Sequence, residues 1–234
     1  MNPAEPATGP RAELTPLRVL ALMDIHWSGR GPLRLPDLAD IDLVLLGGDI
    51  THFAGTDVAK ALVEEIQKAG PRVLAVCGNC DRPEIEGYLE ETGIALDRRA
   101  QVLAGTVFVG LSAGLPFGGC PYERTEEEFA AAGAEAKAAA DEIWAPGPTV
   151  LLAHQPPHGT KCDRAAWVLH VGSRAIRKLI EDWQPDLMLC GHIHESAGTD
   201  RIGETQVINP GPWRSGHSLR FEITTNGIEN LQTT

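Results

Sequence analysis

Five short apolar runs in this sequence each end beside an Asp, Asn or His, residue types that bind metals through oxygen or nitrogen. The runs and the polar residues that follow them are 19–23 with Asp24, 43–48 with Asp49, 73–78 with Asn79, 150–153 with His154, and 187–191 with His192. Short runs rich in Val and Leu predict buried strands, and ligands bind beyond the carboxyl ends of strands in open α/β sheets. We therefore expect these five side chains to meet in one site.

Two more histidines extend this set. Asp24-Ile25-His26 and His192-Ile193-His194 place ligand-type side chains at i and i+2, which point to the same side of extended backbone. Asp49 follows two glycines, which permit a tight turn and a close approach of other groups. The pooled set is Asp24, His26, Asp49, Asn79, His154, His192 and His194.

This mixture of nitrogen and oxygen ligands favours two divalent transition-metal ions. It suits Mn²⁺, Fe, Zn²⁺ or Ni²⁺ better than Ca²⁺, and it lacks the thiolates of structural zinc sites. Seven ligands exceed what one ion usually takes, and they fit two ions if one carboxylate bridges. Asp49 is the natural bridge, because a carboxylate can offer one oxygen to each ion. We expect manganese, with Fe, Ni or Zn as alternatives.

The segments between these runs predict the elements that position the site. A helix is expected over 56–69, capped by Thr56, and another after Asn79, with Asp81 and Glu84 as a capping box. A third is expected over 125–144, with a second capping box, and a fourth from Ser173 to Pro185. Strands are expected near 101–103 and 106–112, joined as a hairpin, and over 204–208, 218–224 and 227–231. This order predicts two sheets packed together and flanked by helices.

Composition limits the cell compartment and the partners. No apolar run approaches the ~20 residues of a membrane span, and residues 1–16 form a Pro/Ala-rich leader without a signal-peptide core. We expect one domain over 17–234 in the cytoplasm, with reduced cysteines and a possible homo-oligomer. A formal net charge of −12 disfavours binding along a nucleic acid. A small anionic substrate remains compatible with this charge, because metal ions would supply the positive centre.

The ordered motifs resemble those of a known family. Asp24-x-His26, Gly48-Asp49, Gly78-Asn79-x-Asp81, His154 after a strand, and Gly191-His192-x-His194 are similar to the motifs of the calcineurin-like metallophosphoesterases, over residues 17 to about 212. The resemblance implies a four-layer α/β/β/α sandwich of two mixed sheets with a binuclear centre. By motif position, Asp24, His26, Asp49 and His194 would hold one ion, and Asp49, Asn79, His154 and His192 the other.

One position departs from the pattern. Many members of this family, but not all of its small prokaryotic members, carry a His after the motif Asn, as the acid that protonates the leaving oxygen, and here that position is Cys80. A thiol with the usual pKa of ~8.5 transfers protons poorly near neutrality. We therefore expect hydrolysis of phosphodiesters or activated aryl phosphates. Which group replaces the missing acid stays open, with His158 and His170 as candidates.

The expected activity is a metal-dependent phosphodiesterase, in which a metal-bridging hydroxide attacks phosphorus. Asp49, Asn79 and His154 are the expected catalytic residues. Asn79 and His170 are the expected substrate contacts, His170 because it precedes a predicted helix N-terminus, which favours phosphate. The alternative from another class is a non-catalytic scaffold that binds a protein. Within enzymes, a nuclease acting on short oligonucleotides or cyclic nucleotides also stays open.

Overall fold

The structure is a computed structural model that describes residues 16–166 and 168–234. The predicted leader over 1–16 lies outside the described residues, except for Pro16. The four α-helices of the described part are α1 (Thr56–Lys68), α2 (Pro83–Glu91), α3 (Glu126–Asp141) and α4 (Arg174–Trp183). Within the described ranges, no helix has the length and apolar character needed to cross a membrane.

The first sheet has the strand order β13-β12-β1-β2-β3. The bounds are β1 (Leu17–Leu22), β2 (Leu43–Gly47), β3 (Arg72–Val76), β12 (Leu219–Thr224) and β13 (Gly227–Thr233). Strands β1, β2 and β3 run parallel, whereas β12 pairs antiparallel with both β1 and β13. The three parallel strands therefore have their carboxyl ends at the same end of this sheet.

The second sheet has the strand order β10-β11-β9-β6-β5-β4. Its strands are β4 (Ala100–Leu103), β5 (Thr106–Leu111), β6 (Thr149–Ala153), β9 (Leu187–Leu189), β10 (Gly198–Ile202) and β11 (Thr205–Asn209). Strands β5, β6, β9 and β11 are parallel, and the hairpin partners β4 and β10 form antiparallel edges. A separate ribbon pairs β7 (Arg164–Ala165) with β8 (Leu169–His170).

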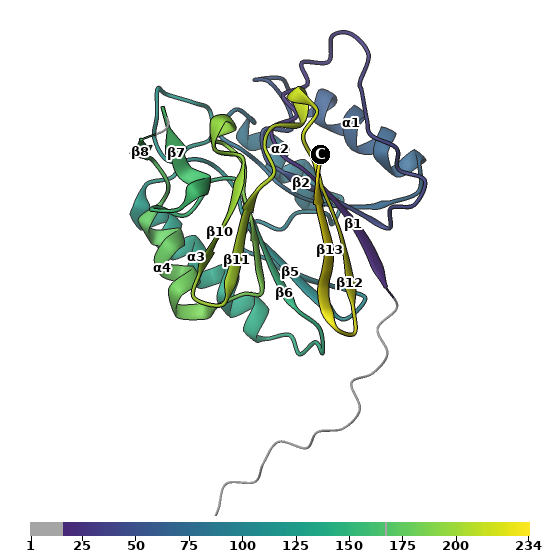
Figure 1. The fold of residues 1–234 in the computed structure, drawn as a ribbon. Coiled ribbons are helices and arrows are strands. Elements are labelled where there is room, and N and C mark those ends of the chain that lie inside the picture. Colours follow the sequence, from purple (N-terminus) through teal and green to yellow (C-terminus); the bar gives the residue numbers. More distant parts are fainter. Residues whose placement is uncertain (1–15, 167) are drawn as a thin grey trace, which may run out of the picture.

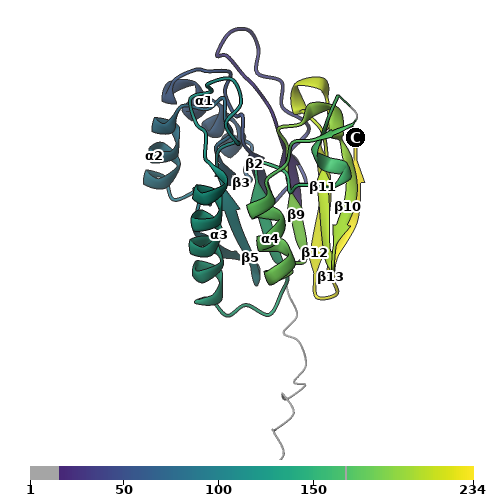
Figure 2. The ribbon, with the colours of Figure 1, turned by 90° about the vertical axis from the view of Figure 1, so that its left-hand side faces the viewer.

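Alternating side chains of the central strands build three apolar layers. In β1, Leu20 and Leu22 face a core shared with α1 and α2, whereas Val19 and Ala21 face the core between the two sheets. A third core joins the outer face of the second sheet to α3 and α4. The order helices, sheet, sheet, helices is visible in Figures 1 and 2. The predicted four-layer α/β/β/α sandwich of two mixed sheets is confirmed.

Two predicted helix caps are wrong and two are confirmed. Helix α1 begins at Thr56 with Gly55 as its N-cap, and α2 has Arg82 as its N-cap, so neither Thr56 nor Asp81 caps a helix. Thr125 and Glu128 form the expected capping box at α3, and Ser173 accepts a hydrogen bond from the Ile176 amide at α4. The Asp81 carboxylate instead accepts hydrogen bonds from Ile50 and Thr51 in the loop after β2 and from the Gly78 amide in its own loop.

Candidate metal centre

The loops that follow five parallel strands converge at one end of the two sheets. Asp24 and His26 follow β1, Asp49 follows β2, Asn79 follows β3, His154 follows β6, and His192 and His194 follow β9. These loops come from both sheets, so the site lies where the carboxyl ends of the two strand sets meet. The structure brings all seven side chains of the expected set into this region.

The first group of ligand-type atoms comprises Asp24, His26 and His194. Their nearest oxygen and nitrogen atoms all lie within 4.8 Å of one another. Nε2 of His194 is 3.2 Å from Oδ1 of Asp24 and 3.3 Å from Nε2 of His26. Three potential donors from two distant segments of the chain therefore face a common point.

Asp49 joins this group to a second one. Its Oδ2 lies 3.4 Å from Nε2 of His26, and its Oδ1 lies 3.5 Å from Nε2 of His154. The same His154 nitrogen is 3.0 Å from Oδ1 of Asn79, and the His192 ring centroid is 5.0 Å from that of His154. The two carboxylate oxygens of Asp49 thus face different groups of ligands.

Four of these residues adopt left-handed backbone conformations, which are uncommon for residues other than glycine. The φ angles are +53° at Asp24, +51° at His26, +48° at Asp49 and +68° at His192. Such conformations cost about 1–3 kcal/mol each and persist where the surrounding structure enforces them, often at functional sites. Four such residues in these loops indicate that the fold tolerates a local cost in stability in order to position these side chains.

Glycines leave the space that the site requires. A Cβ at Gly48 would lie 2.4 Å from Nδ1 of His154, and one at Gly78 would lie 2.2 Å from Oδ1 of Asp49. A Cβ at Gly191 would lie 2.6 Å from Oδ2 of Asp24. These contacts are shorter than any that real side chains tolerate, so the glycines of the sequence motifs are steric requirements of the site.

Hydrogen bonds from the surrounding loops orient the ligand-type side chains. Nδ1 of His154 donates to the Gly47 carbonyl at 3.0 Å, which leaves its Nε2 without a proton when the ring is neutral. The His192 amide donates to both oxygens of Asp24 at 3.1 Å. Nδ1 of His26 is buried and has no hydrogen-bond partner in the described part of the chain.

Burial sets the protonation of two of the histidines. It lowers the pKa of His26 to about 4, and together with the His154 charge it lowers the pKa of His192 to about 4. Burial opposes ionisation of Asp24, but the hydrogen bond from His194 and the neighbouring histidines lower its pKa below the usual value. Neutral imidazoles beside carboxylates are the forms that bind transition metals.

These observations fit a divalent metal centre. The seven side chains offer nitrogen and oxygen donors, and the glycine positions keep space around three of them. Buried carboxylates this close together are costly unless cations compensate their charge. Although burial opposes protonation of His154, the charges of Asp49 and Asp24 raise its pKa above the usual value. The donor set matches the preference of Mn²⁺, Fe, Zn²⁺ or Ni²⁺.

Two thiols lie beside Asn79, and sequence reasoning foresaw only one. The Asn79 amide nitrogen is 3.1 Å from Sγ of Cys120 and 3.7 Å from Sγ of Cys80. Burial, with Asp49 nearby, raises the pKa of Cys80 well above that of a free thiol. Cys120 comes from the Gly/Pro-rich loop between β5 and α3, whose approach no local pattern in the sequence indicates.

The other histidines occupy different places. Nδ1 of His170 bonds to Oδ1 of Asp163 at 2.7 Å, and its ring lies 5.7 Å from that of His158. In the described residues no contact joins either of them to the seven-residue set, so a role in substrate binding or proton transfer stays a prediction for both. The exposed His52 ring, by contrast, lies edge-on to His26 with 5.5 Å between centroids.

Arg214 is a cation at the border of the site. Its Nη2 donates to Nδ1 of His194 at 3.0 Å, so a neutral His194 carries its proton on Nε2, which faces Asp24. Ligation through that Nε2 requires the other tautomer, which Arg214 opposes. Arg214 lies in η3 (Trp213–Ser215), a short 3-10 helix that sequence reasoning did not predict.

Two comparisons of the sequence with known proteins give matches over most of the chain. The sequence profile of the calcineurin-like phosphoesterase superfamily domain matches residues 17–220. An uncharacterized protein of Methanocaldococcus jannaschii is 34% identical over 204 residues, which cover 84% of this chain and 88% of that protein.

Two solved structures share the fold at low sequence identity. The crystal structure of a Thermus thermophilus protein has a TM-score of 0.66 at 17% identity and covers 94% of this chain and 99% of its own. The structure of a dimetal phosphatase from Danio rerio has a TM-score of 0.56 at 12% identity, with coverages of 93% and 98%.

Proposed function

We propose that this chain, which belongs to the calcineurin-like phosphoesterase superfamily, hydrolyses phosphodiesters or activated aryl phosphates with two divalent metal ions. Metal-dependent phosphoester hydrolysis is the activity of this superfamily. The proposal adds three points to that activity: diesters as the substrate, a pair of ions, and manganese as the first candidate for them. The dimetal phosphatase from Danio rerio supports the pair of ions, because its fold is similar.

The position of Asp49 carries the proposal. One of its carboxylate oxygens faces His26 and the other faces His154, at 3.4 and 3.5 Å. Asp24, His26 and His194 would complete one ion's ligand set, and Asn79, His154 and His192 the other's. A single carboxylate between two groups of ligands is the arrangement that holds two ions close together.

When bound, the two ions would acidify a water molecule and neutralise charge on the phosphoryl oxygens. The residues of the chain hold and orient the reacting groups. The Gly47 carbonyl fixes the His154 tautomer, and the Cys80 amide donates to Oδ1 of Asp49 at 2.8 Å, which restrains the bridging carboxylate. Arg214, whose Nη2 is 3.0 Å from Nδ1 of His194, would contact a phosphoryl oxygen bound at the ions. A phosphate that draws Arg214 away from His194 also removes its opposition to ligation through Nε2.

The environment of Cys80 supports the choice of substrate. A buried thiol with a raised pKa is a weak proton donor, so departure of a poor leaving group gains little help from it. Diesters and aryl phosphates with acidic leaving groups need that help least. His52 is the first candidate for another acid, because its ring contacts His26.

Leaving-group chemistry tests this choice. We expect kcat/KM for a series of aryl methyl phosphates to fall steeply as the pKa of the leaving phenol rises, because no efficient acid protonates it. Replacing Cys80 with His should flatten this dependence. If the wild-type dependence is already flat and His52→Gln steepens it, His52 is the acid. If it is flat and neither change affects it, the proposed preference for good leaving groups is wrong.

Metal reconstitution tests the activity itself. Apo protein would be loaded with Mn²⁺, Ni²⁺, Fe²⁺ or Zn²⁺ and assayed with aryl mono- and diesters, with metal content measured in parallel. Asp49→Asn should lose about half of the bound metal or more and nearly all turnover, because an amide bridges two cations poorly. Asp57→Asn removes the same charge from an exposed residue of α1 and should retain both. Full turnover by Asp49→Asn would rule out the bridging role.

A non-catalytic scaffold on the same fold is the alternative function. A scaffold has no need of the strained backbone at Asp24, His26, Asp49 and His192. Retention of that strain together with all seven ligand-type side chains favours the enzyme. A nuclease acting on long polymers is disfavoured by the net charge of −12, whereas short oligonucleotides and cyclic nucleotides remain compatible with it.

A further inference from the structure

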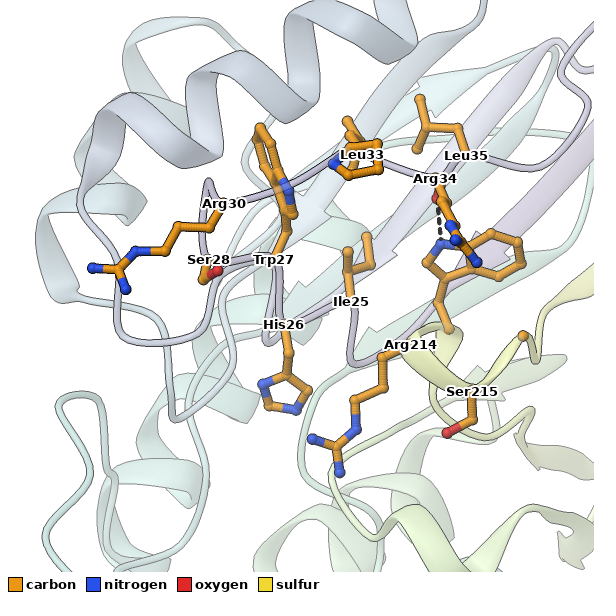
Figure 3. A pocket seen from close by; sticks show the side chains of 13 residues that line it. Ile25, His26, Trp27, Ser28, Arg30, Leu33, Arg34, Leu35, Arg214 and Ser215 are labelled. Atoms are coloured by element: carbon orange, nitrogen blue, oxygen red, sulfur yellow. Dashed lines mark hydrogen bonds between the residues drawn. The ribbon is translucent and has the colours of Figure 1, made fainter.

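A pocket of about 640 Å³ adjoins the metal centre. Its walls come from the loop between β1 and β2 and from η3, and Figure 3 shows Trp27, Leu33 and Leu35 on one side with His26 and Arg214 on the other. Two residues connect it to the centre: His26 belongs to the ligand set, and Arg214 bonds to His194. A substrate whose phosphorus lies at the metals therefore has room for one of its arms here.

Charge in this pocket is opposite to that of the whole chain. Arg30, Arg34 and Arg214 line it, and no Asp or Glu does so among the described residues. The chain as a whole carries 32 acidic against 20 basic residues. The side chains of Arg30 and Arg34 have no carboxylate partner in the described ranges. Figure 3 shows these guanidinium groups on different sides of the pocket. Together, without neutralising carboxylates, they give the pocket a positive potential that favours an anion.

Flat apolar surface accompanies this charge. Trp27 and Trp213 both line the pocket, and both pack their other side against the core under the first sheet. Nε1 of Trp27 is buried and has no hydrogen-bond partner in the described part of the chain, although buried indole N–H groups usually find one. Indole faces next to guanidinium groups are the surfaces on which nucleic acid bases stack.

The pocket walls are held in place by hydrogen bonds. The Trp213 amide donates to the Met23 carbonyl at 2.7 Å, and the Trp213 indole donates to the Arg34 carbonyl at 2.9 Å. The Trp27 amide bonds to the Ile50 carbonyl at 3.2 Å. A volume of this size with fixed walls is typical of small-molecule sites, which span about 300–1,000 Å³.

We infer that this pocket binds the second arm of the substrate, and that this arm is a nucleotide bearing a phosphate of its own. The base lies against the indoles, and the additional phosphate contacts the arginines. This inference rests on the proposed phosphoesterase function and names its substrate class. The reacting phosphorus then lies between the metals and Arg214.

Equilibrium binding separates the base from the phosphates. Tryptophan fluorescence and calorimetry would measure affinities of the wild-type protein for ADP, adenosine, pyrophosphate and an alkyl diphosphate. We expect ADP to bind at least tenfold more tightly than each of the others and to quench fluorescence. An alkyl diphosphate that binds as tightly as ADP would refute recognition of the base, and pyrophosphate that binds as tightly would refute any contribution of the nucleoside.

Charge variants test the arginines. The double variant Arg30→Gln/Arg34→Gln should weaken ADP binding by roughly tenfold and leave adenosine binding within about twofold. Arg72→Gln is the control for loss of positive charge: it removes an exposed guanidinium at the start of β3, at the opposite end of the strands, and should change neither affinity. Equal loss of adenosine and ADP binding in the double variant would show that the two arginines do not act on the phosphate, and unchanged ADP binding would place the phosphate elsewhere. Either result overturns the assignment.

Hydrolysis of a small ester keeps this inference distinct from the proposed function. Bis(p-nitrophenyl) phosphate lacks a nucleotide arm. If the reconstituted wild-type protein hydrolyses it but KM is no lower for the p-nitrophenyl ester of a nucleoside diphosphate, the pocket assignment fails and the phosphoesterase proposal stands. If no ester is hydrolysed with any metal, the proposed function fails, whatever the binding measurements give.

Discussion

Asp81 holds together two of the loops that carry the metal-ligand candidates. Its fully buried carboxylate accepts hydrogen bonds from the amides of Ile50 and Gly78 on Oδ2, at 3.0 and 2.9 Å. On Oδ1 it accepts from the amide and the hydroxyl of Thr51, at 2.8 and 2.9 Å. These bonds connect the loop of Asp49 to the loop of Asn79, so Asp81→Asn should disturb both.

The size of the effect follows from the donors. Burial and the neighbouring Asp49 raise the pKa of Asp81 to about 6, so the carboxylate is ionised at pH 8. An asparagine keeps one acceptor oxygen and turns an NH₂ group toward two donors, so two charge-assisted bonds are lost. At about 1.5–3 kcal/mol each, these bonds contribute about 3–6 kcal/mol. The neutral amide, however, avoids the unfavourable ionisation that the raised pKa records, about 3 kcal/mol at pH 8. The free energy of unfolding should therefore fall by about 0–3 kcal/mol. Loss of such support typically weakens metal affinity by about 10–100-fold.

Urea unfolding and calorimetric titration with Mn²⁺ would measure the two effects. Asp163→Asn is the matched control, because Asp163 is also fully buried and accepts from the amides of Gly159, Thr160 and Gly172. It should lose at least as much stability while metal affinity changes by less than about threefold. Thr51→Val, which removes only the hydroxyl donor, provides a milder variant if Asp81→Asn does not fold. Wild-type metal affinity in Asp81→Asn, despite the expected loss of stability, would refute the link between this carboxylate and the ligand loops.

Two further changes have defined outcomes. Burial, with Asp97 nearby, raises the pKa of Glu86 to about 7 from 4.5; its contribution to stability is therefore fully present below about pH 4.5 and is lost as pH rises through about 7. Urea unfolding should show Glu86→Gln gaining up to about 3 kcal/mol over wild type between pH 5 and pH 8, and parallel pH profiles would contradict this. Gly78→Ala should lower bound metal and cost about 1–3 kcal/mol by overpacking, because its Cβ would lie 2.2 Å from Asp49. Gly87→Ala in α2, where a Cβ meets nothing within 4 Å, is the control. It should raise the free energy of unfolding by about 0.5–1 kcal/mol. Equal metal content in the Gly78 and Gly87 variants would show that the close approach at Gly78 is dispensable.

The sequence predicted best what depends on short-range patterns. Buried strands of parallel sheets are apolar on both faces, so β1, β2, β3, β6 and β9 were visible as continuous runs, and the residues after them were visible as candidates. Strand β10 was missed because Thr199, Asp200 and Arg201 make it polar, as an edge strand can be. Short-range pattern also misled at Asp81, which has the spacing of a helix cap but bonds to amides some 30 residues away.

The pocket and the position of Cys120 were not predicted, because both depend on contacts between segments far apart in the sequence. The pocket forms because η3 returns to the loop after β1, and the bond between Trp213 and Arg34 spans most of the chain. Cys120 reaches Asn79 from a loop whose local sequence predicts only irregular structure. In both cases the contact depends on how the two sheets pack, which no window of adjacent residues encodes.

The place of β1 in the first sheet affects how the protein can fold during synthesis. On one side of β1, Val19 to Leu22 pair with β2, and on the other side Leu17 to Ala21 pair with residues 219 to 223 of β12. During translation, β1 therefore has one hydrogen-bonding edge unpaired until β12 has been synthesised. His192 and His194 also arrive late, so the nascent chain cannot complete its ligand set before most of it is made. Chaperone capture, or premature pairing of that open edge with another chain, would be expected in this interval.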